Sequence, residues 1–191
     1  MRFLILLAVL ALALAGTAAW VHEDEPDWYL RARYPLEYEQ LVRASALRRD
    51  LDPALVAAVI YAESRFDPNV RSSAGAVGLM QILPETAEFI ARKTGGRDFV
   101  RADLRDPEIN VRYGTWLLDY LRDYYDGDLS TALAAYHAGP GAVDEWRRRG
   151  EGIAYPETEA YVREVARVRQ IYERAYGLEL RVSAGARPPS E

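Results

Sequence analysis

The 191-residue sequence predicts an all-α fold. Apolar residues recur at helical spacing in most segments between residues 36 and 177. Several of these segments open on Asp-Pro or Pro and close at Gly, which is typical of helix starts and stops. No segment shows the strict apolar–polar alternation of a strand, and there is no internal repeat. A chain of this length holds one domain with a sizeable core plus a terminal extension.

The N-terminal segment is expected to be a targeting sequence. Residues 3–21 carry no charge, Arg2 precedes them, and acidic residues follow from Glu23 onward. This pattern indicates a secretory signal peptide, with small residues at Ala13–Ala15 for cleavage, or an uncleaved membrane anchor. Either way, we expect an exported, extracytoplasmic protein with membrane attachment through residues 3–21 where the segment is not cut.

The composition along the sequence divides the chain into four parts. Residues 1–21 are the signal or anchor, 22–35 a charged, proline-broken linker, 36–177 the folded domain, and 178–191 a disordered tail.

Within the domain the patterns predict a series of helices. They are expected at residues 38–49, 53–64, 84–94, 107–125, 130–138, 140–149 and 156–176. The aromatic stripe of the helix that starts at Pro107, which includes Tyr113, Trp116, Tyr120 and Tyr124, is expected to lie in the core.

Composition excludes several functional classes. The chain has no cysteine, so we expect no disulfide and no thiol nucleophile. Its net charge of −5 and the absence of a basic stripe argue against nucleic acid. His22 and His137 lie far apart and belong to no metal-binding motif, so we expect neither a metal nor a cofactor. We expect a monomer.

Glu63 is the best candidate for an acid catalyst. It ends the helix that starts at Pro53 and shares a face with Val56, Val59 and Ile60. Burial among apolar side chains keeps a carboxyl protonated near neutral pH, as general-acid catalysis requires. The alternative for a glutamate at a helix end is an ordinary ion pair with a nearby arginine.

Two segments could form a cleft beside Glu63. In the loop of residues 72–81, Gly75 and Gly78 allow a polymer to approach the backbone, and Gln81 can bond to sugar hydroxyls and acetamides. In residues 135–141, small side chains surround Tyr136, which either makes a tight turn or presents a phenol to the cleft.

A second carboxylate, which glycosidases usually require, is hard to find. Glu157 is the best remaining candidate, although it also suits the N-terminus of the last helix.

The sequence resembles the soluble-lytic-transglycosylase-like (SLT) domains. The resemblance covers residues 55–168 and rests on four motifs in order. They are Glu63-Ser64, Gly78-Leu79-Met80-Gln81, Ala135-Tyr136-His137-Ala138-Gly139, and Glu157-Thr158 to Tyr161-Val162. It implies a lysozyme-like α fold and non-hydrolytic cleavage of the β-1,4 bond between N-acetylmuramic acid and N-acetylglucosamine in peptidoglycan. The implied partner is therefore the glycan strand, and the implied location is the periplasm or cell wall.

The resemblance also implies roles for the matching residues. Glu63 would be the single acid and base that leads to a 1,6-anhydro product. Ser64 would orient Glu63 or the substrate acetamide, and Tyr136 would stabilise the charged intermediate. Gly78, Met80 and Gln81 would line the sugar cleft, and Glu157 would support the site from across the groove.

One position departs from the family pattern, since His137 stands where the family usually has asparagine. An imidazole replaces only one of the two hydrogen bonds of an amide. Two other interpretations stay open at this point: a goose-type lysozyme-like hydrolase, and a non-catalytic wall-binding module with the same fold.

Overall fold

The computed structural model describes residues 25–96 and 99–181, and the leader of residues 3–21 and residues 182–191 lie outside this range. Its residues fall into two compact units, one ending at Pro35 and the other beginning at Leu36. The described residues form helices without any strand, which confirms the all-α prediction. Among them, no helix combines the length and apolar character needed to cross a membrane.

The first unit contains a short helix, α2 (Asp27–Arg33), where the sequence indicated only a linker. Asp27 lies in its first turn and Arg31 and Arg33 in its last, so its charges complement the helix dipole. The two flanking prolines obscured this seven-residue helix in the sequence.

The second unit contains the remaining helices, and each helix expected in the domain is present. In chain order they are α3 (Glu39–Leu47), α4 (Pro53–Ser64), α5 (Pro84–Thr94), the 3-10 helix η1 (Arg101–Arg105), α6 (Pro107–Tyr124), α7 (Leu129–Ala138), α8 (Pro140–Arg148) and α9 (Pro156–Leu180). The 3-10 helix was not predicted. Helix α9 continues through Leu180 instead of stopping before Gly177, so the expected tail begins too early.

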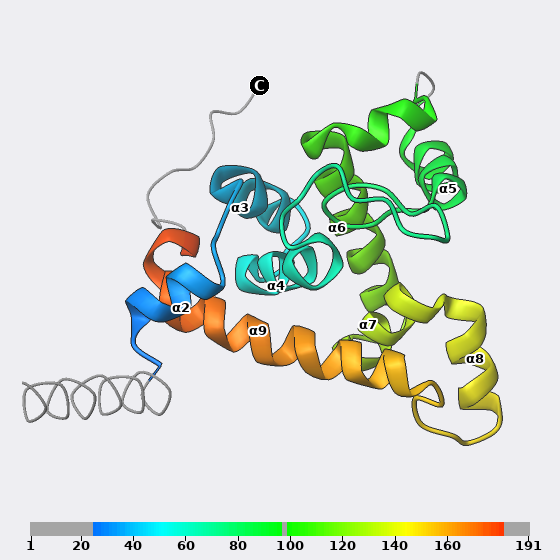
Figure 1. Cartoon of the computed structure of the whole chain (residues 1–191). Coiled ribbons are helices and arrows are strands. Elements are labelled where there is room, and N and C mark those ends of the chain that lie inside the picture. The colour runs from blue at the N-terminus through cyan, green and yellow to red at the C-terminus, as the bar shows by residue number, and fades with distance from the viewer. Residues whose placement is uncertain (1–24, 97–98, 182–191) are drawn as a thin grey trace, which may run out of the picture. The chain divides into compact units, whose positions relative to one another are not determined.

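Helix α4 lies at the centre of this unit. Every side chain from Ala54 to Tyr61 is buried, because the helix is apolar on all sides. It packs mainly against α9, which also runs past α7 (Figure 1). Asp52 caps its start by accepting a hydrogen bond from the amide of Ala54 (2.9 Å). The C-terminal end of this buried helix carries Glu63.

The prediction for the aromatic stripe of α6 was wrong at its C-terminal end. Tyr113 is buried as expected, but Tyr120 and Tyr124 are 38% and 54% exposed. The rings of Trp116, Tyr120 and Tyr124 stack on one another along the helix instead of entering the core. Helical spacing placed these residues on one face correctly, but it does not indicate where the partner helices stop covering that face.

Candidate active site

Glu63 occupies the last turn of α4, where the chain turns sharply out of the helix. Arg65 and Phe66 both adopt left-handed backbone conformations (φ 54° and 66°), which ends the helix directly after Ser64. The Glu63 side chain is half-buried, and this burial raises the pKa of its carboxyl from 4.5 to about 7. The group therefore exists as a mixture of acid and carboxylate near neutral pH.

Two phenols lie beside Glu63, one from α7 and one from α9. Burial, together with the negative charge of Glu63, raises the pKa of both Tyr136 and Tyr161 well above the usual value. The Tyr136 hydroxyl donates a hydrogen bond to the carbonyl of Met80 (2.8 Å). The Tyr161 hydroxyl lowers the pKa of Glu63 against the effect of burial. It is buried, yet it has no hydrogen bond of good geometry with any described atom.

The loop that faces Glu63 is held in place by buried hydrogen bonds. The hydroxyl of Ser64 donates to the carbonyl of Leu79 (2.8 Å), with the carbonyl of Ile60 at 3.1 Å. Ser64 thus fastens the loop to the end of α4, and its hydroxyl bonds to the backbone and not to the Glu63 side chain. It can orient Glu63 only through the backbone.

Asn110, on α6, holds the same loop from the other side. Its side-chain oxygen accepts a hydrogen bond from the amide of Met80 (2.7 Å). Its Nδ2 group donates to the carbonyls of Val77 (2.8 Å) and Leu104 (2.9 Å). Gly78 packs directly against this amide, and a Cβ at residue 78 would lie only 2.3 Å from Nδ2 of Asn110. The absence of a side chain at Gly78 therefore leaves the space that the Asn110 amide occupies.

The Met80 side chain is fully buried and does not line a cleft, which corrects the expectation for its thioether. It packs against Gly114 of α6, where an added Cβ would lie 2.3 Å from the sulfur atom. Met80 contributes to the site through its main-chain carbonyl, the acceptor for Tyr136.

Gln81 is half-buried and adopts a left-handed conformation (φ 47°). Its side-chain amide donates to the carbonyls of Val70 (3.0 Å) and Gly78 (2.9 Å). These bonds use both amide hydrogens on the loop and leave the side-chain oxygen as the group able to accept from a ligand.

His137 is exposed at the C-terminal end of α7 and contacts α9. Its Nδ1 atom lies 3.1 Å from Oγ1 of Thr158, and its ring stacks on Tyr161 at 4.6 Å. Desolvation lowers the pKa of His137, and the nearby Glu157 opposes this effect.

Glu157 lies in the first turn of α9, and its side chain is exposed. Its negative charge raises the pKa of His137. No carboxylate among the described residues contributes to the pKa shift of Glu63. Glu157 thus acts on the protonation of His137 and not on that of Glu63.

A groove of about 530 Å³ begins at Tyr136 and His137. The start of α5, with Leu83 and Phe89, and the middle of α6, with Tyr120, form its other walls, so its lining is largely apolar. Glu85 is the carboxylate among the lining residues, and it is exposed and pairs with Arg101 (3.6 Å). Tyr136, one of the two phenols beside Glu63, thus forms part of the wall of this groove.

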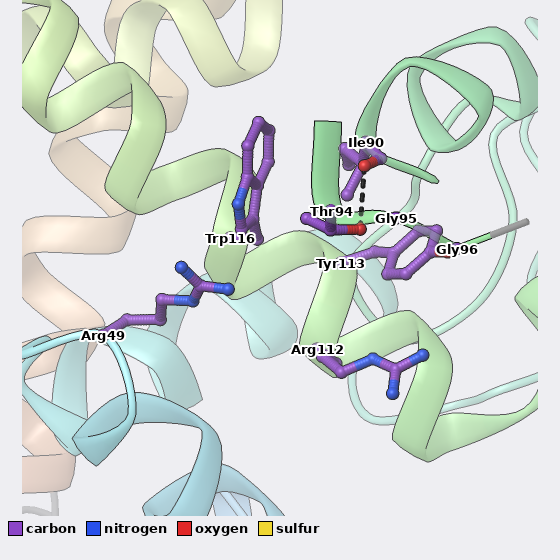
Figure 2. A pocket seen from close by; sticks show the side chains of 8 residues that line it. All are labelled: Arg49, Ile90, Thr94, Gly95, Gly96, Arg112, Tyr113 and Trp116. Carbon is purple, nitrogen blue, oxygen red and sulfur yellow. Dashed lines mark hydrogen bonds between the residues drawn. The ribbon is translucent and has the colours of Figure 1, made fainter. Parts of the chain in front are cut away.

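A second hollow, of about 250 Å³, lies between the residues before α4, the end of α5 and α6 (Figure 2). Arg49, Arg112, Tyr113 and Trp116 line it, and it contains none of the candidate site residues. No acid faces into it, so it is not the place for general-acid chemistry. No group of His, Asp or Glu able to hold a metal ion occurs in the described part of the chain.

Two contributors to the site were not predicted from the sequence. Tyr161 follows Glu157 by one helical turn and was named only as part of the fourth motif, without a role in the site. Asn110 is a fully buried polar residue, and its position next to Val111 on an otherwise apolar face was the available signal.

The fold is that of a lysozyme-like transglycosylase domain. The family model for the transglycosylase SLT domain matches residues 40–155, and the chain belongs to this family. The soluble lytic murein transglycosylase of Salmonella typhimurium is 33% identical over 148 residues, which cover 72% of this chain and 23% of that protein. The membrane-bound lytic murein transglycosylase C of Actinobacillus pleuropneumoniae is 38% identical over 123 residues, or 60% of this chain and 33% of that protein.

A solved structure agrees with these relatives. An inactive mutant of the lytic transglycosylase Slt from Pseudomonas aeruginosa superposes with a TM-score of 0.72 at 31% identity, covering 78% of this chain and 26% of that one. The chain thus spans about a quarter of the length of the soluble relatives that it matches.

Proposed function

We propose that the protein is a peptidoglycan lytic transglycosylase that cleaves the β-1,4 bond between N-acetylmuramic acid and N-acetylglucosamine. One observation carries this proposal: burial raises the pKa of the Glu63 carboxyl to about 7, its neighbour Tyr136 lines the groove, and no carboxylate among the described residues contributes to that pKa shift. Hydrolases of glycosides usually need two carboxylates, one of them to activate water or to attack the sugar. A single acid suits a reaction in which the substrate provides both nucleophiles.

In the first step, Glu63 in its acid form donates its proton to the glycosidic oxygen. The bond between C1 and that oxygen breaks, and the carbonyl oxygen of the substrate's own acetamide attacks C1. Glu63 is then a carboxylate. A pKa near the working pH makes the acid form available at the start without making the later base too weak.

In the second step, the Glu63 carboxylate takes the proton of the muramoyl C6 hydroxyl. The C6 oxygen attacks C1 and displaces the acetamide oxygen, which gives the 1,6-anhydro product and returns Glu63 to its acid form. No water is consumed. The unpartnered hydroxyl of Tyr161 is suited to donate to the carboxylate between the two steps, when Glu63 is charged.

The remaining residues support this chemistry in the proposal. The Tyr136 oxygen, whose hydrogen is bound to the Met80 carbonyl, turns its lone pairs toward the developing positive charge. Gln81 and His137 contact the glycan, while Ser64 and Gly78 keep the loop in place. Glu157 acts from the rim through His137.

The proposal includes an extracytoplasmic location, in the periplasm or cell wall. The relatives are named as soluble and as membrane-bound murein transglycosylases, so both forms occur in proteins of this kind. Residues 1–21 would serve as a signal peptide or an anchor, and the glycan strand would be the partner of a monomeric enzyme acting without a cofactor.

The test is the release of soluble muropeptides from purified wall sacculi. We expect release by the wild-type protein and a loss of at least about 100-fold in the Glu63→Gln variant, because the acid is removed without a change of shape. Glu151→Gln, which changes an exposed carboxylate in the loop after α8, is the matched control and should leave release unchanged. Sacculus binding by the wild-type protein without any release would instead support a non-catalytic wall-binding module.

A further inference from the structure

We infer that Thr158 fixes the tautomer of His137, so that the imidazole presents an Nε2–H donor to the groove. Thr158 is fully buried in the first turn of α9, and its Oγ1 atom lies 3.1 Å from Nδ1 of His137. This contact is the hydroxyl's one hydrogen-bond partner among the described residues. A buried hydroxyl needs an acceptor for its hydrogen. Thr158 therefore donates to Nδ1, which must be unprotonated, and the hydrogen of the neutral ring is on Nε2.

The ring cannot easily turn to exchange its two nitrogens. It stacks on Tyr161 with the centroids 4.6 Å apart and the planes 29° apart, while Thr158 holds its Nδ1 edge. Since the Nδ1 edge is turned toward α9, the opposite edge, with Nε2, is the exposed one. His137 is exposed and forms part of the groove wall, so this edge faces a ligand.

The charges around His137 favour the neutral ring at neutral pH. Burial of part of the ring lowers the pKa of His137, and Glu157 of α9 opposes this only in part. Glu85 of α5, across the groove, pairs with Arg101. Protonation would place a hydrogen on Nδ1 and deprive the Thr158 hydroxyl of its acceptor, which further disfavours the cation.

This assignment defines the ligand chemistry at residue 137. The groove is mainly apolar, and a single N–H donor in such surroundings selects an oxygen acceptor. Asparagine at this position would offer an acceptor as well as donors. If the proposed function holds, the Nε2–H group of His137 donates a hydrogen bond to a carbonyl or hydroxyl oxygen of the glycan strand. Thr158 is then a positioning residue for that contact.

The direct test is nitrogen-15 NMR of the full chain with labelled histidine. The chain has two histidines, and a His22→Gln variant identifies the signals of His137. We expect a proton on Nε2 and none on Nδ1 in the wild-type protein above the His137 pKa. In Thr158→Val we expect a mixture of tautomers and a higher His137 pKa, because the neutral form has lost its donor. A proton on Nδ1 in the wild type, or an unchanged ring in Thr158→Val, would overturn the inference.

Two further variants separate the tautomer from general damage to the fold. Thr158→Ser keeps the hydroxyl and should keep the wild-type tautomer. Thr115→Val removes another buried hydroxyl, which bonds within α6, and should leave His137 unchanged. If Thr158→Val does not fold, a wild-type tautomer in Thr158→Ser together with Nε2–H in the wild type still supports the inference, and any other result contradicts it.

Enzyme kinetics test whether His137 contacts the substrate. We expect Thr158→Val to raise KM for soluble wall fragments several-fold with a smaller change in kcat, since His137 binds and does not react. Equal loss in kcat with an unchanged KM would contradict a binding role. If the wild-type protein releases no product, the proposed function fails, but the NMR experiment still decides the tautomer.

Discussion

At the residue scale, Glu63 combines a half-buried carboxyl with a pKa of about 7, and the unpartnered Tyr161 hydroxyl lies next to it. The proposed reaction begins with the acid form. We therefore expect kcat/KM to fall as pH rises through about 7. The phenol of Tyr161 lowers the pKa of Glu63, so Tyr161→Phe should move this fall to higher pH. A pH–rate profile of both proteins checks the prediction, and a shift to lower pH would contradict it.

The same pKa has a consequence for stability that does not depend on activity. Between pH 4.5 and about 7 the unfolded chain releases the Glu63 proton while the folded protein retains it, so the stability contribution of this residue falls over that window. The loss is about 3 kcal/mol, from 1.36 kcal/mol per pKa unit. The Glu63→Gln variant has no carboxyl at this position and does not lose this stability. It should therefore be more stable than the wild type above pH 7 and equally stable near pH 4.

Urea denaturation at both pH values measures this difference. Glu151→Gln, an exposed change, should show no such dependence on pH relative to the wild type. An equal effect of Glu63→Gln at the two pH values would mean that the Glu63 carboxyl titrates normally.

The sequence was sufficient to identify Glu63 as the candidate acid, but it did not identify all of the residues around Glu63. Glu63 stands out because a carboxyl ends a helix that is otherwise apolar. Tyr161 and Thr158 do not stand out, because helical spacing alone cannot distinguish a packing residue from one whose polar atom contacts a site residue on another helix. Met80 was assigned to the cleft by resemblance, and only the three-dimensional position shows that its carbonyl, and not its side chain, reaches the site.

At the element scale, the loop of residues 72–81 depends on α6 for its shape. Asn110 makes three hydrogen bonds to main-chain groups, two of them in this loop and one at Leu104 of η1. In Asn110→Ala all three bonds are lost, although the Val77 carbonyl still accepts from the amide of Ile82 (3.1 Å), and we expect a loss of about 3 kcal/mol in the free energy of unfolding. Denaturant titration measures it. Asn69→Ala, at an exposed position on the neighbouring turn, is the control and should cost much less.

The two glycines of the loop allow a second test at this scale. Gly75 and Gly78 both adopt positive φ (90° and 82°), so alanine is strained at either position. A Cβ at residue 78 would also collide with Asn110, whereas a Cβ at residue 75 meets no atom within 4 Å. Gly78→Ala should therefore cost at least about 1 kcal/mol more than Gly75→Ala and should also reduce activity. Equal losses of stability would contradict the packing role of Gly78.

The elements themselves were predictable where their ends carry strong local signals. Asp52-Pro53 and Asp106-Pro107 each combine a capping side chain with a proline, and the structure starts α4 and α6 at these positions. The short helices α2 and η1 lack a side-chain cap, and no comparable signal marked them. The exposure of Tyr120 and Tyr124 depends on which helices lie opposite, and this information is not local.

At the scale of the whole molecule, the chain contains the SLT domain and spans about a quarter of the soluble relatives. The domain contains the helix that carries Glu63, the loop held by Ser64 and Asn110, and the two phenols from α7 and α9. These parts come from segments far apart in the sequence, and their contacts link them to Glu63 and Ser64 in the last turn of α4. We propose that this domain is sufficient for the reaction.

The central claim is that one acid acts without water, and the products of a wall digest test it most directly. Mass spectrometry of the muropeptides released by the full chain should show 1,6-anhydro ends, one water lighter than the products of a hydrolase, and these species should be absent with Glu63→Gln. Products with reducing ends, formed by the wild-type protein and abolished by the same substitution, would contradict the claim and assign the Glu63 site to hydrolysis.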